Sequence, residues 1–133
     1  MDRYACAFDS GGRLKRARKK ASEEKHQQWL AKWLDSRPGL HWFHTPNGGA
    51  RSVVVGRKLK AQGAKAGIPD VIIITPPPKR PTARGVALEL KTEKGRVSEH
   101  QKRWLAVFAA FGWETYVAHG WIDATDWLIE LGY

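Results

Sequence analysis

Apolar and polar residues recur along the chain with two different periods, which predict an ordered series of helices and strands. Residues 22–35 fit a helix, because Leu30, Trp33 and Leu34 share one face and Ser22 is a favourable N-cap. Residues 40–45 fit a strand that ends in a Pro-Asn-Gly-Gly turn. Residues 51–62 are ambiguous, because three valines favour a strand and the basic run after them favours a helix. We favour a short helix that ends before a glycine.

Three further strands are expected in the second half of the chain. Residues 71–75 form a continuous β-branched apolar run, which is typical of a central strand covered on both faces. Residues 76–82 contain four prolines and are expected to form an exposed loop. Residues 86–91 and 113–118 are the other two predicted strands.

Two helices complete the pattern. Ser98 is expected to cap a helix that runs through Phe111, with Leu105, Phe108 and Phe111 on its core face. Asp123 is expected to cap a last helix that ends near residue 131. The order helix, strand, helix, strand, strand, helix, strand, helix predicts an α/β fold, with a mixed central sheet flanked by helices.

The net charge of +10 is concentrated in two segments. Residues 1–20 hold seven basic and two acidic residues, and residues 51–68 hold five basic residues and no acid. Two basic segments on a neutral body indicate a polyanionic partner, which we expect to be nucleic acid. The single cysteine excludes an intrachain disulfide, and no apolar run is long enough to cross a membrane. We therefore expect a cytoplasmic protein with no membrane partner.

The two basic segments supply the candidate phosphate contacts. We interpret residues 1–21 as a basic arm and residues 22–133 as one folded domain. The alternative is that the basic block of the arm extends the next helix backward. The expected contacts of the arm are Arg13, Lys15, Arg16, Arg18, Lys19 and Lys20. Those of the second segment are Arg51, Arg57, Lys58, Lys60 and Lys65. Contacts of this kind give affinity without reading sequence.

Charged residues also occur where a core would be expected. Glu89 and Lys91 alternate with Leu88 and Leu90 in one predicted strand, so the charged pair shares one face and the leucines point into the core. If the proline-rich loop joins the two apolar strands as an antiparallel hairpin, Asp70 falls near Glu89 or Lys91. Two carboxylates and a lysine would then meet at one end of the hairpin.

Such a cluster has a chemical use. Two carboxylates are hard oxygen ligands for Mg²⁺ or Mn²⁺, which can polarise a phosphodiester oxygen and lower the pKa of a water molecule. Lys91 can position that water or offset developing charge. The alternative is an ordinary ion pair at a strand end. Glu-x-Lys alone is common, and it gains specificity here from the Pro-Asp pair that precedes an apolar strand.

Asp70 followed by Glu89-Leu90-Lys91 is similar to the PD-(D/E)xK nuclease motif in order and separation. The wider pattern resembles the VRR-NUC branch of that superfamily over about residues 22–120, most of the chain. The residues that carry this resemblance are Lys65 to Pro69, Gly95, Ser98, Gln101, Trp104, Gly112 and the upstream stretch 43–49. With no further domain in front, the chain resembles the stand-alone form of phages and bacteria.

The resemblance implies a restriction-endonuclease-like fold and a Mg²⁺- or Mn²⁺-dependent DNA endonuclease. It further implies a homodimer that acts on branched DNA such as four-way junctions. Asp70 and Glu89 would bind the metal, with the backbone carbonyl of Leu90 as a further ligand. A helical glutamate would reach the metal's water shell, and Lys91 and Gln101 would complete the catalytic set.

Two of these assignments have alternatives. Gln101 could close a capping box with Ser98 or support the catalytic centre; we expect it to do one of these at a time and favour the catalytic centre. Glu23 and Glu24 both suit the first turn of a helix. We choose Glu23 as the helical acid, because residues at i+4, i+7 and i+11 from it continue along one face, and keep Glu24 as the fallback.

Two other functions remain open at this stage. One is a DNA-binding module that keeps the nuclease fold without catalysis, and the other is a nuclease that acts on RNA. The intact Asp-Glu-Lys set argues against a pure binding module, because two carboxylates facing a polyanion would weaken binding.

Overall fold

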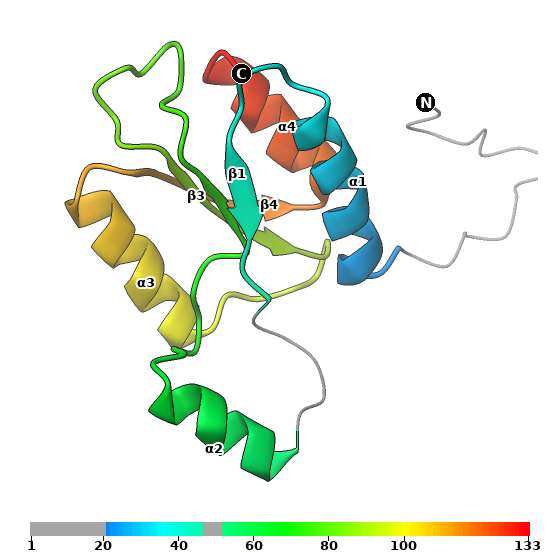
Figure 1. Ribbon diagram of the computed structural model, residues 1–133. Coiled ribbons are helices and arrows are strands. Elements are labelled where there is room, and N and C mark those ends of the chain that lie inside the picture. The colour runs from blue at the N-terminus through cyan, green and yellow to red at the C-terminus, as the bar shows by residue number, and fades with distance from the viewer. Residues whose placement is uncertain (1–20, 47–51) are drawn as a thin grey trace, which may run out of the picture.

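A computed structural model describes residues 21–46 and 52–133, which form a four-stranded mixed sheet with helices on both faces (Figure 1). Arg51 and the six arm cations lie outside the described residues, so their predicted roles are not addressed by the structure. The elements follow the predicted order, and the α/β class is confirmed. Their bounds are α1 Glu23–Asp35, β1 Trp42–His44, α2 Val53–Ala61, β2 Val71–Ile73, β3 Val86–Lys91, α3 Glu99–Ala110, β4 Glu114–His119 and α4 Trp121–Glu130.

The strands lie in the order β1-β2-β3-β4. β1 pairs with β2 and β2 with β3 in antiparallel fashion, whereas β3 pairs with β4 in parallel through the crossover helix α3. Val71 lies opposite Leu88, so continuing this register sets Asp70 opposite Glu89. The predicted hairpin is therefore confirmed, and it brings the acid before β2 to the acid within β3.

The sheet lies between two helical layers. α1 and α4 pack together on one face, and α3 covers β3 and β4 from the other (Figure 1). Leu30 and Leu34 of α1 are fully buried, as are Leu88 and Leu128, and each such side chain contributes about 2 kcal/mol by leaving water. All three residues of β2 are buried, which confirms a strand covered on both faces.

The start of α1 is fixed by its cap and by this packing. The Ser22 side chain accepts a hydrogen bond from the Lys25 amide, as the predicted N-cap should. Glu23 is the first residue of the helix, and Leu30 and Leu34 anchor the later turns in the core. The position of Glu23 therefore follows from two buried leucines further along the same helix.

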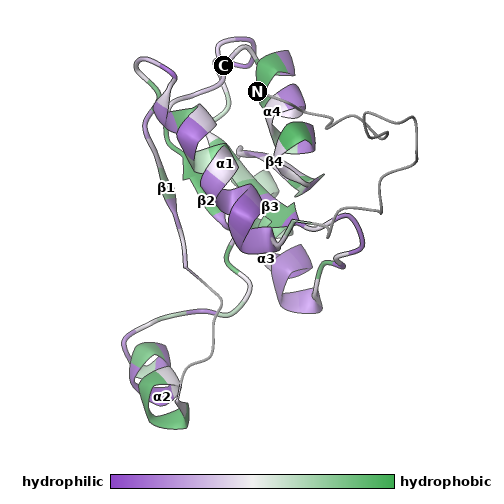
Figure 2. Cartoon of the chain, turned by 90° about the vertical axis from the view of Figure 1, so that its right-hand side faces the viewer, coloured by the Kyte–Doolittle hydropathy of each residue, from purple (hydrophilic) through white to green (hydrophobic). Residues whose placement is uncertain are grey.

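The predicted helix in residues 51–62 is also confirmed, as α2, with Ser52 as its N-cap. It differs from the other helices in its surroundings. α2 stands away from the sheet (Figures 1 and 2), and none of its residues is buried. Val53, Val54 and Val55 are 46–69% exposed. No helix in residues 21–46 or 52–133 is long and apolar enough to span a bilayer.

Two predictions about helix ends were wrong. Phe111 is 70% exposed and does not belong to the core face, because α3 ends at Ala110 and the backbone of Phe111 already departs from the helix. Asp123 is not an N-cap, because α4 begins earlier, after Gly120. Asp123 instead accepts hydrogen bonds from the Tyr116 hydroxyl and the His119 amide, which tie the start of α4 to the end of β4.

Strand bounds also shifted from those expected. β1 covers only residues 42–44 of the expected 40–45, and β2 stops at Ile73 before the prolines. β4 begins and ends one residue later than expected. These differences leave the register of the hairpin unchanged.

A close contact between backbones positions the segment that leads to Asp70. Gly67 has a φ of +84°, and a Cβ there would lie 2.5 Å from the carbonyl carbon of His100 and 2.7 Å from the Gln101 amide nitrogen. The chain therefore passes directly against the first turn of α3, which only glycine permits. This contact joins the approach to Asp70 with the helix that carries Gln101.

We predict that Gly67→Ala destabilises the protein by more than Gly63→Ala. Both glycines have positive φ, but a Cβ on Gly63 meets nothing within 4 Å. Gly63→Ala should thus cost only the backbone penalty of about 1–2 kcal/mol. Gly67→Ala must in addition displace backbone, and urea unfolding of the two variants would measure the difference. Equal losses would contradict the close packing.

Candidate active site

Asp70, Glu89 and Lys91 converge at one end of the β2–β3 hairpin, as the sequence predicts. Asp70 Oδ2 accepts a hydrogen bond of 2.8 Å from the Leu90 amide, which fixes the carboxylate against β3. The Lys91 ammonium lies 3.5 Å from Glu89 Oε1, and both side chains are nearly buried. Two acidic side chains and one basic side chain are therefore held together, and Glu89 and Lys91 have little access to water.

Glu89 is the most constrained member of this group. It is 1% exposed in a strand that is covered on both faces. Its Oε1 atom accepts a 2.8 Å hydrogen bond from Gln101 Nε2 in addition to the Lys91 contact. Among the described residues, no N–H or O–H donor hydrogen-bonds to the other oxygen, Oε2, although it is buried. The protonated form of Glu89 can itself hydrogen-bond to the Asp70 carboxylate. A buried carboxylate oxygen without a partner is costly, so this atom is a candidate ligand for a cation.

The surroundings of Glu89 favour its neutral form. Burial raises the pKa of Glu89 to about 8, with a further rise from the Asp70 carboxylate that Lys91 only partly offsets. Without a cation the carboxyl group therefore holds a proton near neutral pH. A divalent cation bound between the two acids would offset their mutual repulsion and so favour the ionised form of Glu89.

Gln101 makes both of the contacts that the sequence analysis treated as exclusive, the one in the capping box and the one to the acidic cluster. Its Oε1 accepts a hydrogen bond from the Ser98 amide in a complete capping box, and its Nε2 donates to Glu89. The expectation of one role at a time was wrong, because the two ends of a primary amide are separate acceptor and donor groups. The cap of α3 thereby also orients the buried glutamate.

The structure separates the two candidate helical acids. Partial burial raises the pKa of Glu23, Lys91 lowers it and Asp70 raises it again, so Glu23 lies within the field of the cluster. The Glu24 side chain instead accepts a hydrogen bond of 3.5 Å from Gln28 on the exposed side of α1. Of the two acids, Glu23 is therefore the one whose pKa responds to Asp70 and Lys91, and its predicted role as the helical acid stays a prediction.

The donor set fits a hard divalent cation. The described residues contain no cluster of three or more His, Cys, Asp or Glu side chains that could hold a metal, so a cation here would take two carboxylates and other oxygens. The N–H and C=O of one residue in an extended strand point the same way, so the Leu90 carbonyl faces the side of Asp70. Two carboxylates, one carbonyl and waters are typical of Mg²⁺ or Mn²⁺ and not of zinc.

Gln27 is a polar residue on the same face of α1 as Glu23, and the sequence analysis gave it no role. It lies one turn after Glu23 in α1, and its amide nitrogen is buried with no hydrogen-bond partner among the described residues. The sequence did contain a signal that Gln27 is buried, because it lies three residues before the fully buried Leu30 on the same face of the helix. A buried donor at this position suits a phosphate oxygen or a water molecule.

The predicted phosphate contacts that the structure describes are all exposed. Arg57, Lys58 and Lys60 project from α2, and Lys65 follows in the segment that leads toward Asp70. Lys60 and Lys65 line a hollow between α2 and α3, whereas Arg57 and Lys58 do not. Their contacts with DNA remain predictions.

Comparisons with known proteins agree with this fold and identify a family. The model of the VRR-NUC domain family matches residues 21–121. A solved structure described as a VRR_NUC domain protein superposes with a TM-score of 0.69 at 22% identity, covering 86% of this chain and 90% of that one. A second, described as a VRR_NUC domain, has a TM-score of 0.54 at 20% identity and covers 85% of this chain and 100% of that one. No curated protein matches the chain.

We predict that Glu89→Gln stabilises the protein in EDTA. Burial raises the pKa of Glu89 in the folded protein to about 8, above the ordinary value of 4.5. The folded protein therefore has its full stability below pH 4.5 and loses stability as the pH rises through about 8. Glutamine stays neutral and keeps the oxygen that Gln101 contacts. The variant should therefore melt several degrees above the wild type at pH 8.5, at about 4 °C per kcal/mol, with a smaller gap at pH 5.

The matched control is Glu99→Gln, since the Glu99 side chain is 90% exposed and its substitution should leave the melting temperature unchanged. Added Mn²⁺ should stabilise the wild type and the control but not Glu89→Gln. A wild type and Glu89→Gln that melt together at both pH values would show that Glu89 is not held in this buried environment.

Proposed function

Because the chain belongs to the VRR-NUC family of nuclease domains, we propose that it is a Mg²⁺- or Mn²⁺-dependent endonuclease that hydrolyses DNA phosphodiester bonds. The observation that carries the proposal is Glu89, an acid in a fully covered strand with one oxygen unpartnered among the described residues. A domain that only bound DNA would gain nothing from a buried acid beside a second acid. A cation site gives both acids a use.

Each residue of the cluster would have a separate role in hydrolysis. Asp70, Glu89 and the Leu90 carbonyl would hold the cation, and Gln101 keeps the Glu89 carboxylate in orientation. A divalent cation, when bound, polarises a phosphodiester oxygen and lowers the pKa of a water molecule. Lys91 would place its ammonium next to the scissile phosphate and offset the charge that develops there.

Two further polar side chains would deprotonate or orient the attacking water molecule. Burial raises the pKa of Glu23, which would make it a better proton acceptor for the water, and its carboxylate lies within the electrostatic influence of Asp70 and Lys91. Gln27, one turn further along α1, would donate from its buried amide to a phosphate oxygen or to that water. Both residues lie on the helix that the two buried leucines anchor.

We further infer that the substrate is branched DNA and that the active species is a homodimer. The net charge of +10 supports a DNA partner, because neutralised phosphates release counterions. One site cuts one strand, so paired incisions across a junction need two copies. The preference for four-way junctions comes from the resemblance to the VRR-NUC family.

The test of substrate compares linear duplex, single-stranded, flap and four-way-junction DNA, each with Mg²⁺, Mn²⁺ or EDTA. We expect metal-dependent cleavage that is fastest on the junction, by a species that light scattering identifies as a dimer. Equal rates on duplex and junction by a monomer would contradict the inference about branched DNA. A preference for RNA of the same shapes would replace DNA as the substrate.

We predict that Lys91→Ala slows cleavage by about 100-fold or more while DNA binding and circular dichroism stay unchanged. Lys91 acts on the reacting phosphate, whereas affinity comes from many other cations. Lys102→Ala is the matched control, because Lys102 is exposed and pairs only with Glu99 among the contacts described. Unchanged cleavage by Lys91→Ala would remove this residue from the mechanism.

We predict that Glu23→Gln slows cleavage by about tenfold or more, the effect expected of a residue that acts beside metal ligands. The neighbouring Glu24→Gln has the same charge change in the same helical turn and should stay within about twofold of the wild type. Saturating rates with Mn²⁺ would measure both. The opposite ranking would make Glu24 the helical acid.

A further inference from the structure

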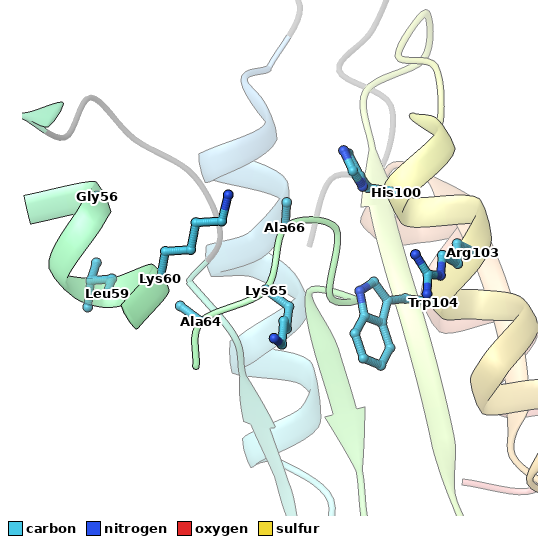
Figure 3. A pocket seen from close by; sticks show the side chains of 9 residues that line it. All are labelled: Gly56, Leu59, Lys60, Ala64, Lys65, Ala66, His100, Arg103 and Trp104. Carbon is cyan, nitrogen blue, oxygen red and sulfur yellow. The ribbon is translucent and has the colours of Figure 1, made fainter. Parts of the chain in front are cut away.

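A basic hollow lies beside the cluster, between α2 and α3. It has a volume of about 710 Å³, and Figure 3 shows its lining residues. Lys60 reaches toward it from α2, and His100, Arg103 and Trp104 border it from α3. Residues 64–66 cross between the two helices. No lining residue in this described part of the chain is acidic.

The chemistry of the lining combines cations with one aromatic ring. Lys60, Lys65 and Arg103 are exposed donors that suit phosphate oxygens. The indole of Trp104 projects from α3 toward Lys65 (Figure 3). Aliphatic contacts come from Leu59, Ala64 and Ala66. A flat ring between cations is the arrangement with which proteins hold unpaired bases, the ring stacking on the base and the cations tracking the backbone.

The size of the hollow favours an unpaired strand over a duplex. Sites of about 300–1,000 Å³ take ligands of small-molecule size, so a volume of 710 Å³ suits one or two nucleotides. The bases of a duplex are stacked on one another and are not free to turn toward a ring in the lining of a hollow. An unpaired nucleotide can turn its base toward Trp104.

The hollow also adjoins the catalytic cluster. His100 in its lining precedes Gln101, whose amide binds Glu89. The segment 64–66 leads through Gly67, which touches the His100 backbone, to Asp70. A strand whose phosphate lies at Asp70 and Glu89 would therefore pass the hollow within a few nucleotides.

We propose that this hollow is a binding site for an unpaired nucleotide of the DNA substrate, with the base stacked on Trp104 and the flanking phosphates on Lys65 and Arg103. The inference rests on the proposed nuclease function and makes its substrate more specific. The DNA strand cleaved at Asp70 and Glu89 would be unpaired next to the cut. Branch points and flaps supply such nucleotides, whereas linear duplex does not.

The experiment measures binding of labelled oligothymidylate and of a duplex of equal length by fluorescence anisotropy in EDTA, where no cleavage occurs. Trp104→Ala should weaken oligothymidylate binding by about tenfold and leave duplex binding within about twofold. Trp104→Phe should recover most of the loss. Phe111→Ala is the matched control, since it removes an aromatic side chain that is 70% exposed at the other end of α3.

A second pair of variants keeps the test independent of the packing of Trp104. Lys65→Gln with Arg103→Gln should flatten the salt dependence of log K for oligothymidylate by about 1.4, at about 0.7 for each phosphate contact on single strands. Lys79→Gln with Arg80→Gln removes the same charge from the loop at the opposite end of the hairpin and should leave that slope unchanged.

Three results would overturn the proposal. The first is no loss with either set of variants, and the second is equal weakening of oligothymidylate and duplex. The third is a change of oligomeric state on Trp104→Ala, which would assign the hollow to a second copy of the chain. If the protein binds oligothymidylate through Trp104 but cleaves no nucleic acid, the proposed nuclease function is wrong and the proposed nucleotide site stands.

Discussion

The structure depends on one unfavourable interaction, the burial of the Glu89 carboxyl group beside Asp70. A charged acid in a strand that is covered on both faces costs several kcal/mol unless it is paired. The fold meets only part of this cost, with Gln101 and Lys91 both directed at one oxygen. The second oxygen has no hydrogen-bond partner among the described residues, and it is the atom that we propose binds a cation.

The surrounding elements are arranged to hold this acid in place. The hairpin register sets Asp70 opposite Glu89, and the Leu90 amide fixes the Asp70 carboxylate. The close contact of Gly67 with α3 brings the helix cap to the same point, so one side chain, Gln101, ends the helix and orients the acid. The same side chain therefore stabilises the start of α3 and contacts the acid that we propose binds a cation.

Much of this arrangement could be predicted from sequence because it depends on local pattern. The alternation of charge and leucine in β3 separated the two faces, and the prolines after β2 indicated a hairpin, which together placed Asp70 near Glu89. The predictions that failed concern where helices end and which way side chains point. Gln101 was assigned a single role because a sequence does not show that the two ends of its amide point to different partners. Asp123 was taken for a cap because the sequence did not show that the helix begins before it, after Gly120, and that its carboxylate accepts hydrogen bonds from Tyr116 and His119 instead. The hollow between α2 and α3 could not be predicted, since its walls meet only in three dimensions.

The most direct test of the central claim is the anomalous scattering map of crystals soaked in Mn²⁺. The account predicts one strong peak within about 2.0–2.6 Å of Glu89 Oε2 and of an Asp70 oxygen, the distances expected for oxygen ligands of such a cation. The same soak of Glu89→Gln crystals should give no peak there. A wild-type map with no peak at these carboxylates, or with peaks only elsewhere, would contradict the claim that Glu89 is buried in order to bind a cation.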